Sequence, residues 1–261
     1  GLLLPKAAGA GWGEAWEVLS GLSVIDVLVM TGLWALGLWL YTYVYTASLP
    51  GLGHAQALNL NLTGSLVSNL LPFGGAAGVA NTYGLTFSWG FGGVATSLMV
   101  LVSGLANLLI RIVLPVVGLL ALMTSDAALP EGANGVVEST LLVLILLALL
   151  VLLMLVSARV AGAIGTAADV VIRWLAVAIR RPAPTPRFRA AAIHMQRDAV
   201  GILRSGWYKI AFGMIAYYAS ELALFAWALN SLGAPIGIAE TTAAFALSRV
   251  LTSVVVTPSG V

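Results

Sequence analysis

Cysteine is absent from this sequence, and charged residues are scarce. Of the 261 residues, 8% are Asp, Glu, Lys or Arg and the net charge is +2, whereas charged residues make up about 25% of a soluble domain. The lack of cysteine excludes disulfides, thiolate metal sites and cysteine nucleophiles. The two histidines, His54 and His194, lie far apart in sequence, so neither a metal site nor any other cofactor is expected. The small net charge gives no support to nucleic-acid binding.

The sequence contains several long runs of apolar residues. Apolar residues form 60% of the sequence and the mean hydropathy is +1.02, although about 45–50% apolar residues is usual in soluble domains. A run of about 20 apolar residues crosses the hydrocarbon core of a bilayer as a helix. We therefore expect an all-α polytopic integral membrane protein, in which residues 1–261 form one transmembrane domain of a longer chain.

About five spanning helices are expected. The clearest predicted spans are Ser23–Leu49, Trp89–Leu122, Ser139–Val160 and Trp207–Leu229. Pro115 predicts a bend within the second of these spans. An aromatic belt at the membrane interface is predicted near the end of the first span, from Trp39, Tyr41, Tyr43 and Tyr45.

Two further apolar segments contain polar residues or breaks, and both are candidates for re-entrant hairpins. They are Gln56–Leu71 and Ile238–Val256. In the first, Asn61, Ser65 and Ser68 recur on one helical face and form a polar stripe. The following stretch, Pro72–Gly93, has seven glycines in 22 residues and is expected to break any helix. Irregular backbone is tolerated at membrane depth only where protein or a watery cavity surrounds it.

The basic residues predict the orientation in the membrane. Nine of the 12 lie between Arg159 and Lys209, whereas the segment Met123–Glu138 has three acidic residues and no basic one. The positive-inside rule therefore places the first stretch in the cytoplasm and the second outside. Residues 162–206 are expected to hold a cytoplasmic amphipathic helix on the inner leaflet and a basic linker. The composition, rich in Ala, Gly, Val and Arg and poor in Lys, suggests a bacterium of high GC content, and the cytoplasmic membrane is the expected location.

Three charged side chains lie inside predicted membrane segments: Arg111, Glu221 and Arg249. A charge at membrane depth costs several kcal/mol and usually faces a bundle interior or an aqueous cavity. One interpretation is that the arginines hold a phosphate-type head group, which Glu221 balances. The alternative is an ion pair of Glu221 with Arg111 or Arg249 that fixes the helix packing. The sequence leaves both interpretations open.

The glycine-rich loop also has two interpretations. Glycines before a helix N-terminus let backbone N–H groups approach an anion closely, and helix breaks near the midplane mark substrate sites in transporters. The alternative is close helix packing through the pair Gly74 and Gly78. Because Pro72–Gly74 and Pro258–Gly260 share a Pro-x-Gly spacing, an inverted repeat whose two breaks meet near the midplane is a further hypothesis.

The segment Ser68–Gly78 resembles the first signature of the lysylphosphatidylglycerol synthase transmembrane-region family, which includes the flippase half of the bacterial multiple peptide resistance factor. Its residues read Ser-Asn-Leu-Leu-Pro-Phe-Gly-Gly-Ala-Ala-Gly. The second signature of that family begins Pro-x-Thr-Pro-Gly-Gly, and Val255–Val261 resembles this opening, with Ser259 in place of the first glycine. The similarity extends from about Val24 to Val261, and between the two loops it is one of composition only.

The resemblance implies lipid translocation between leaflets and not catalysis, so enzyme activity is not expected. Family members are associated with flipping aminoacylated phosphatidylglycerol or polyprenyl-phosphate-linked sugars. The expected partners are therefore membrane lipids, a lipid-linked substrate and a synthetase or glycosyltransferase. Two other functions stay open: a membrane-embedded enzyme acting on a lipid phosphate, and a scaffold subunit for such a partner.

The expected mechanism is a polar cavity that takes the head group while the acyl chains stay in lipid. The polar stripe and both Pro-Gly loops are expected to line it. The predicted translocation residues are Asn69, Pro72, Gly74, Gly75, Gly78, Arg111, Glu221, Arg249, Thr257, Pro258 and Gly260.

Overall fold

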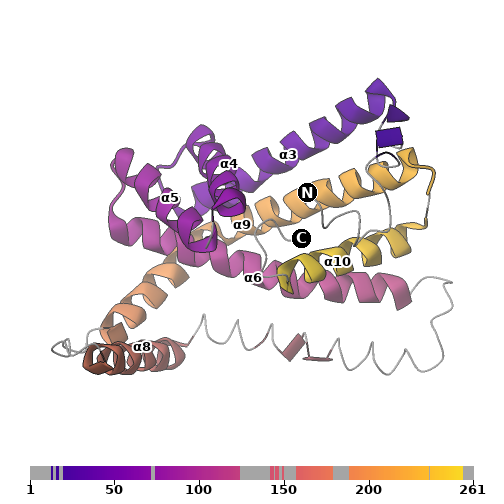
Figure 1. Ribbon diagram of the computed structural model, residues 1–261. Helices are drawn as coiled ribbons and strands as arrows, with labels where there is room; N and C mark the ends of the chain where they lie inside the picture. Colours follow the sequence, from indigo (N-terminus) through magenta and orange to yellow (C-terminus); the bar gives the residue numbers. More distant parts are fainter. Residues whose placement is uncertain are drawn as a thin grey trace.

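The described part of the chain is helical throughout, apart from short turns. The computed structural model describes residues 20–71, 74–123, 157–178, 188–234 and 236–254, together with a few isolated positions (Figure 1). Its helices are α3 (Val24–Ser48), α4 (His54–Leu70), α5 (Gly74–Ser88), α6 (Gly93–Met123), α8 (Ala158–Ala178), α9 (Phe188–Ser231) and α10 (Ile238–Val254). Of the predicted span Ser139–Val160, the structure describes only isolated positions and residues 157–160.

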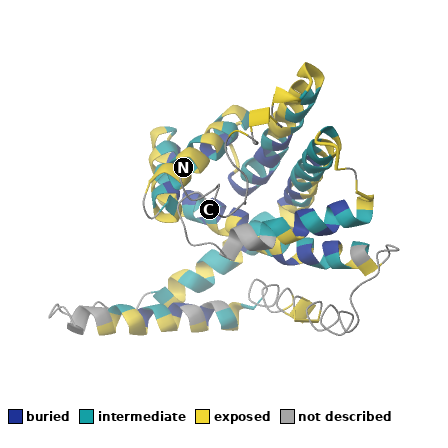
Figure 2. Cartoon of the chain, turned by 45° about the vertical axis from the view of Figure 1, so that its right-hand side comes forward, coloured by how far each residue is buried: buried dark blue, intermediate teal, exposed yellow. Residues whose placement is uncertain are grey.

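Three of these helices are long and apolar enough to cross a membrane: α3, α6 and α9. The helices α4, α5 and α10 have 17, 15 and 17 residues. At about 1.5 Å per residue, each is shorter than the roughly 30 Å hydrocarbon core of a bilayer. Many large apolar residues of the long helices are exposed, and Figure 2 shows exposed positions along these helices. This architecture agrees with the predicted α-helical membrane protein.

Helices α3 and α9 form an antiparallel pair. At one end of the pair, Asp26 accepts hydrogen bonds from Trp227 Nε1 (3.0 Å) and from Ser231 Oγ (2.8 Å). At the other end, a Cβ on Gly206 would lie 3.3 Å from the carbonyl oxygen of Ala47. Small residues at the contact let the two backbones approach closely, which is a common way for membrane helices to associate.

One tight contact within this pair predicts the effect of a substitution. A Cβ on Gly213 would lie 3.0 Å from Val44 Cγ2 and 3.1 Å from the carbonyl oxygen of Leu40. We expect Gly213→Leu to lower the free energy of unfolding by about 1–3 kcal/mol, the usual cost of overpacking. The control is Gly201→Leu on the same helix, where a Cβ would meet no atom within 4 Å. Thermal unfolding in detergent measures both variants, and equal midpoints would contradict the tight contact.

Helices α4 and α5 form a hairpin, so the expectation that Pro72–Gly93 breaks any helix is wrong. Residues Gly74–Ser88 within this stretch are helical. Glycine costs about 1 kcal/mol relative to alanine in a helix interior, but here it permits a close contact with α4. A Cβ on Gly74 would overlap the Ser68 carbonyl oxygen, and one on Gly78 would overlap the Ser68 hydroxyl. The structure therefore supports the packing interpretation of these two glycines.

The base of the hairpin is fixed to α3 and α6. A buried apolar cluster lies there, formed by Leu49, Leu52, Ala57, Leu60 and Met99. Thr42 Oγ1 and His54 Nδ1 are 2.6 Å apart, which ties the first residue of α4 to α3. The Thr96 hydroxyl donates to the Thr86 hydroxyl at 2.9 Å, which ties α5 to α6. At the opposite end of the hairpin, the side chain of Leu70 is 71% exposed, so the hairpin is held mainly at its base.

Helix α10 packs against the second half of α6. A Cβ on Gly118 would lie 2.5 Å from Ala246 Cβ, so the two helices are in close contact there. Helix α6 begins at Gly93 and not at the predicted Trp89, because the residues between them form a turn. It runs as one helix through Pro115.

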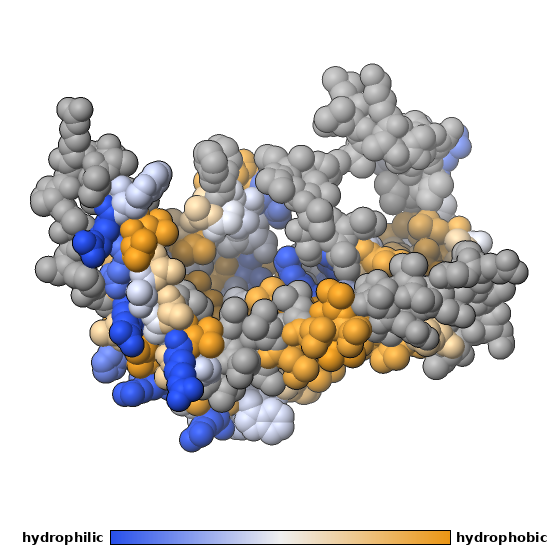
Figure 3. Space-filling view, turned by 90° about the horizontal axis from the view of Figure 1, so that it is seen from below, coloured by the Kyte–Doolittle hydropathy of each residue, from blue (hydrophilic) through white to orange (hydrophobic). Residues whose placement is uncertain are grey.

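Helix α9 is much longer than the predicted span Trp207–Leu229. It begins at Phe188 and has 44 residues, so the predicted linker is helical from that residue onwards. Its start is fixed by α8, because the buried Asp169 carboxylate accepts hydrogen bonds from the backbone N–H groups of Phe188 and Arg189. A carboxylate is favourable at a helix N-terminus. Hydrophilic side chains gather at this end of the molecule, at the left of the view in Figure 3.

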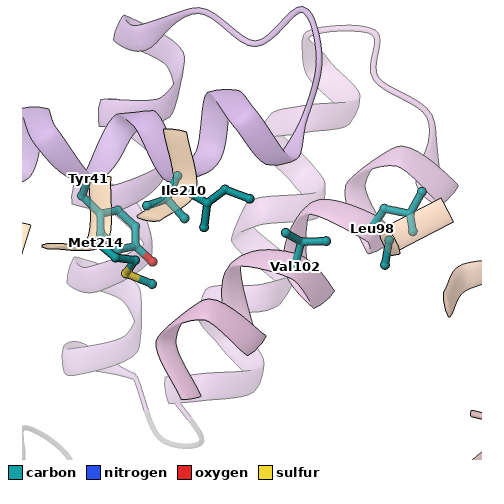
Figure 4. Close-up of a cluster of buried hydrophobic side chains, with 7 residues drawn as sticks. Tyr41, Leu98, Val102, Ile210 and Met214 are labelled. Carbon is teal, nitrogen blue, oxygen red and sulfur yellow. The ribbon is translucent and has the colours of Figure 1, made fainter. Parts of the chain in front are cut away.

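The main apolar core lies where α3, α6 and α9 meet. Its buried members are Tyr41, Val44, Leu98, Val102, Ala199, Ile210 and Met214 (Figure 4). Tyr41 is 7% exposed, so its prediction as part of an interfacial aromatic belt is wrong. Its ring packs edge to face against Tyr45 and Tyr217. A buried tyrosine needs a partner for its hydroxyl, and that partner belongs to the candidate site.

Candidate functional site

Two adjoining cavities lie among α3, α4, α5, α6, α9 and α10. The smaller has a volume of about 200 Å³ and is lined by Tyr41, Asn61, Asn107, Arg111, Tyr217, Tyr218 and Arg249. The larger has a volume of about 400 Å³ and extends between α4, α5 and α6. Tyr41, Asn61 and Asn107 line both. We call the two together the polar cavity.

The larger cavity is lined by uncharged polar side chains and by apolar ones, and we call it the neutral part. The side chains of its Asn, Ser and Thr residues are those of Asn61, Ser65, Ser68, Asn69, Thr82, Ser103 and Asn107, and its apolar side chains include Leu60, Val79, Met99 and Val100. Helical residues three and four apart face the same side, and the polar stripe of α4 accordingly lies on this wall. None of the described residues that line the neutral part is charged. The wall therefore offers hydrogen bonds without a net charge.

The smaller cavity is lined by Arg111 and Arg249, two of the charged residues that the sequence predicts inside the membrane, and we call it the charged part. Arg249 from α10 forms an ion pair with Glu221 from α9, whose side chain is 16% exposed. The Arg249 guanidinium also lies over the Phe245 ring, 4.9 Å from its centre. A carboxylate in such surroundings is stable only with a partner. Of the two pairings that the sequence leaves open for Glu221, the structure shows the one with Arg249.

Arg111 from α6 faces the same space. It lines the charged part together with Arg249 of α10 and with Tyr217 and Tyr218 of α9. Among the described residues, the charged groups at this part of the cavity are the two arginines and Glu221. Because a guanidinium group binds phosphate oxygens in a bidentate manner, the charged part is suited to an anion of that kind.

Asn107 joins the two parts of the polar cavity. Its side-chain amide donates hydrogen bonds to the Tyr41 hydroxyl at 2.5 Å and to the Ser103 carbonyl oxygen at 2.9 Å. These two bonds use both amide protons, and the amide oxygen keeps its capacity to accept. The partner of the buried Tyr41 hydroxyl is thus a residue on the cavity wall, which fixes α3 against α6 at the junction.

The structure brings most of the predicted site residues together. Asn69, Gly75 and Gly78 line the neutral part, and Arg111 and Arg249 line the charged part. Glu221 belongs to the charged part through its ion pair. Gly74 lies at the contact between α4 and α5 and is not among the lining residues.

Four predicted site residues lie outside the described residues: Pro72, Thr257, Pro258 and Gly260. The inverted repeat was based on the Pro-x-Gly segments that contain them. It therefore stays a prediction.

Sequence reasoning missed Tyr41, Asn107, Tyr217 and Tyr218, although two signals were present. Ser103, Asn107 and Arg111 recur every four residues on an otherwise apolar helix, and Tyr217 precedes Glu221 by one turn. A polar residue one turn from an intramembrane charge shares its helical face. A search for polar residues one helical turn from each of these charges would have identified Asn107 and Tyr217. Tyr41 is recognised as a site residue only once the fold is known, because it lies on another helix.

Comparisons with known proteins give no match. Neither a family model nor a curated protein nor a solved structure matches this chain. Among the described residues, no group of three or more His, Asp or Glu side chains could hold a metal ion. The function is therefore argued from the polar cavity itself.

Proposed function

We propose that this protein is a flippase of the bacterial cytoplasmic membrane. Its substrate would be an anionic or aminoacylated phospholipid, or a polyprenyl-phosphate sugar. The observation that carries the proposal is the polar cavity, because two arginines and a wall of amides and hydroxyls lie among helices able to cross a membrane. The resemblance at Ser68–Gly78 supports the same function, since Asn69, Gly75 and Gly78 of that segment line the cavity.

The polar cavity would lower the cost of moving a head group through hydrocarbon. Polar and charged groups cost several kcal/mol there unless they are hydrogen-bonded or paired. In the proposed mechanism, the charged part binds the phosphate and the neutral part binds the rest of the head group, while the hydrophobic chains stay in lipid. Arg249 exchanges Glu221 for the phosphate, so the ion pair satisfies both side chains when no substrate is bound.

The α4–α5 hairpin is the proposed re-entrant element that opens and closes the neutral part. Its helices, of 17 and 15 residues, are about 25 and 22 Å long, too short to cross the roughly 30 Å core. Because the hairpin is fixed at its base, movement about that base widens the neutral part without separating α3 from α9. The segment around Pro258 is its proposed counterpart in an inverted repeat of about five spans and two re-entrant segments.

The orientation of α9 is a prediction that single cysteines can test, because the chain has no cysteine of its own. The basic residues near the start of α9 place that end in the cytoplasm, so its other end faces outside. We expect Leu232→Cys to react with a membrane-impermeant maleimide in intact cells, and Ser205→Cys to react only after permeabilisation. Both positions are exposed. The reverse pattern of labelling would overturn the orientation.

Reconstitution into vesicles tests the flippase itself. Fluorescent probes of the three substrate classes are placed in both leaflets, and dithionite is added to quench those that reach the outer leaflet. We expect the protein to raise the quenched fraction for at least one class without altering the lipid. Arg111→Met should abolish this effect, whereas Arg204→Met, at an exposed position on α9, should not. Quenching that stays at the level of empty vesicles for all three classes would refute the proposal.

A further inference from the structure

A groove separate from the polar cavity runs between α8 and the start of α9. It consists of two adjoining hollows of about 580 and 710 Å³, and Thr166, Val170 and Arg189 line both. None of the described residues that line either hollow also lines the polar cavity. We call the two hollows the α8–α9 groove. Figure 3 shows hydrophobic side chains among the hydrophilic ones at this end of the molecule.

The two helices that form the groove are packed closely against each other. A Cβ on Gly165 would lie 2.5 Å from the carbonyl oxygen of Phe188, and one on Gly162 would lie 3.3 Å from Ile193 Cδ1. The carboxylate of Asp169 accepts hydrogen bonds from the first two backbone N–H groups of α9. The groove therefore lies between helices whose contact is specified by small residues and by a buried carboxylate.

Three arginines line the groove and are divided between its hollows. Arg173 and Arg189 line one hollow, and Arg159 and Arg189 line the other. Each hollow thus offers two guanidinium groups, which bind phosphate oxygens in a bidentate manner. Arg159 and Arg173 are 14 residues apart on α8, which corresponds to about 21 Å along the helix axis. This spacing suits two phosphates better than one.

Apolar side chains accompany these arginines. Val170, Val171 and Trp174 of α8 are 60%, 54% and 69% exposed. Valine and tryptophan beside arginine on one helix are typical of a surface at the membrane interface. On α9, Ile193 of the groove is six residues, about 9 Å, from Ala199, which is buried in the main apolar core. The groove is therefore close to the helices that can cross a membrane and within reach of a lipid.

We infer that the α8–α9 groove binds a phospholipid with two phosphates. One phosphate contacts the arginines of each hollow, and the acyl chains cover Val170, Val171 and Trp174. Basic pockets beside membrane helices bind head groups of this kind. The bound lipid is a resident component of the protein and not its cargo, since the groove lies apart from the polar cavity. The inference goes beyond the proposed function and does not depend on it.

Lipid retention by the purified full chain tests the inference. The delipidated protein is incubated in detergent with tetraoleoyl cardiolipin, dioleoylphosphatidylglycerol or dioleoylphosphatidylcholine, and native mass spectrometry counts the lipids that stay bound. We expect a single cardiolipin to bind about fivefold more tightly than phosphatidylglycerol, the gain from one additional attraction between an arginine and a phosphate. Phosphatidylcholine, which has no net charge, should bind more weakly than both.

Variants locate the bound cardiolipin. Arg189→Met should lower the affinity most, by about fivefold, because Arg189 lines both hollows. Arg173→Met should lower it too, and it keeps the test valid if Arg189→Met does not fold. The matched control is Arg204→Met, which removes an exposed arginine of α9 that lines neither hollow. Arg111→Met removes an arginine of the polar cavity. Both should leave the affinity for cardiolipin unchanged.

Each contrary result overturns a stated part of the inference. Equal affinities for cardiolipin and phosphatidylglycerol would exclude a site for two phosphates. Equal losses in Arg189→Met and Arg204→Met would indicate general attraction to a basic surface, and a loss in Arg111→Met alone would place the lipid in the polar cavity. If none of the three lipids is retained, the groove is not a lipid site and suits an acidic protein partner instead. No measurement here involves lipid transfer, so the flippase proposal is tested separately.

Discussion

Arg249→Met is expected to lower the free energy of unfolding by about 2–3 kcal/mol and to abolish lipid transfer. The substitution leaves the Glu221 carboxylate, 16% exposed, without its ion-pair partner. Removing one member of a fully buried pair costs about 3–5 kcal/mol, and we expect less here because the Arg249 side chain is 37% exposed. Lipid transfer is lost because one of the two arginines proposed to bind the phosphate is gone. Unfolding in detergent and dithionite quenching in vesicles measure the two effects separately.

The double variant Arg249→Met/Glu221→Gln separates the role of the ion pair in folding from its role in transfer. Replacing both partners of a buried pair is often far milder than removing one, so we expect part of the stability to return while transfer stays abolished. Arg204→Met should leave both properties unchanged, because that arginine is exposed on α9. If the double variant is as unstable as the sum of the two single variants, the side chains are not coupled, and the ion pair does not stabilise the fold.

Features fixed by nearby residues could be predicted from the sequence. The first span was expected from Ser23 onwards, and in the structure the Ser23 side chain accepts a hydrogen bond from Asp26 in a capping box at the start of α3. The polar stripe was expected on one face of Gln56–Leu71, and Asn61 and Ser65 lie on one wall of the polar cavity. Spacing along a single helix sufficed in both cases.

Features fixed by contacts between distant residues could not be predicted in this way. Glycine content alone argued against α5, and the compensating contact of Gly74 with Ser68 exists only once the hairpin has formed. Likewise, the basic residues before Trp207 suggested a linker, but Ala199 in that stretch is buried in the same apolar cluster as Leu98 of α6. Tyr41 looked interfacial for the same reason, because its partner Asn107 lies on another helix.

Gly75→Leu is expected to abolish lipid transfer while leaving the fold intact. Gly75 lines the neutral part of the polar cavity, and a Cβ there would meet no protein atom within 4 Å. The leucine side chain would therefore occupy the space in which the head group is proposed to move, without displacing α4 or α6. We expect the dithionite-quenched fraction to fall to that of empty vesicles, with no change in the thermal unfolding midpoint.

Two other glycines of α5 show whether the effect of Gly75→Leu is a local block. Gly84 also has open space around a Cβ but is not among the cavity-lining residues, so Gly84→Leu should preserve both transfer and stability. Gly74→Ala should lower the unfolding midpoint, because its Cβ would overlap the Ser68 carbonyl oxygen. Equal loss of transfer in Gly75→Leu and Gly84→Leu would mean that α5 tolerates no large side chain, and not that the head group passes Gly75. Normal transfer by Gly75→Leu would remove the α4–α5 hairpin from the substrate path, because a leucine in the neutral part would then obstruct nothing.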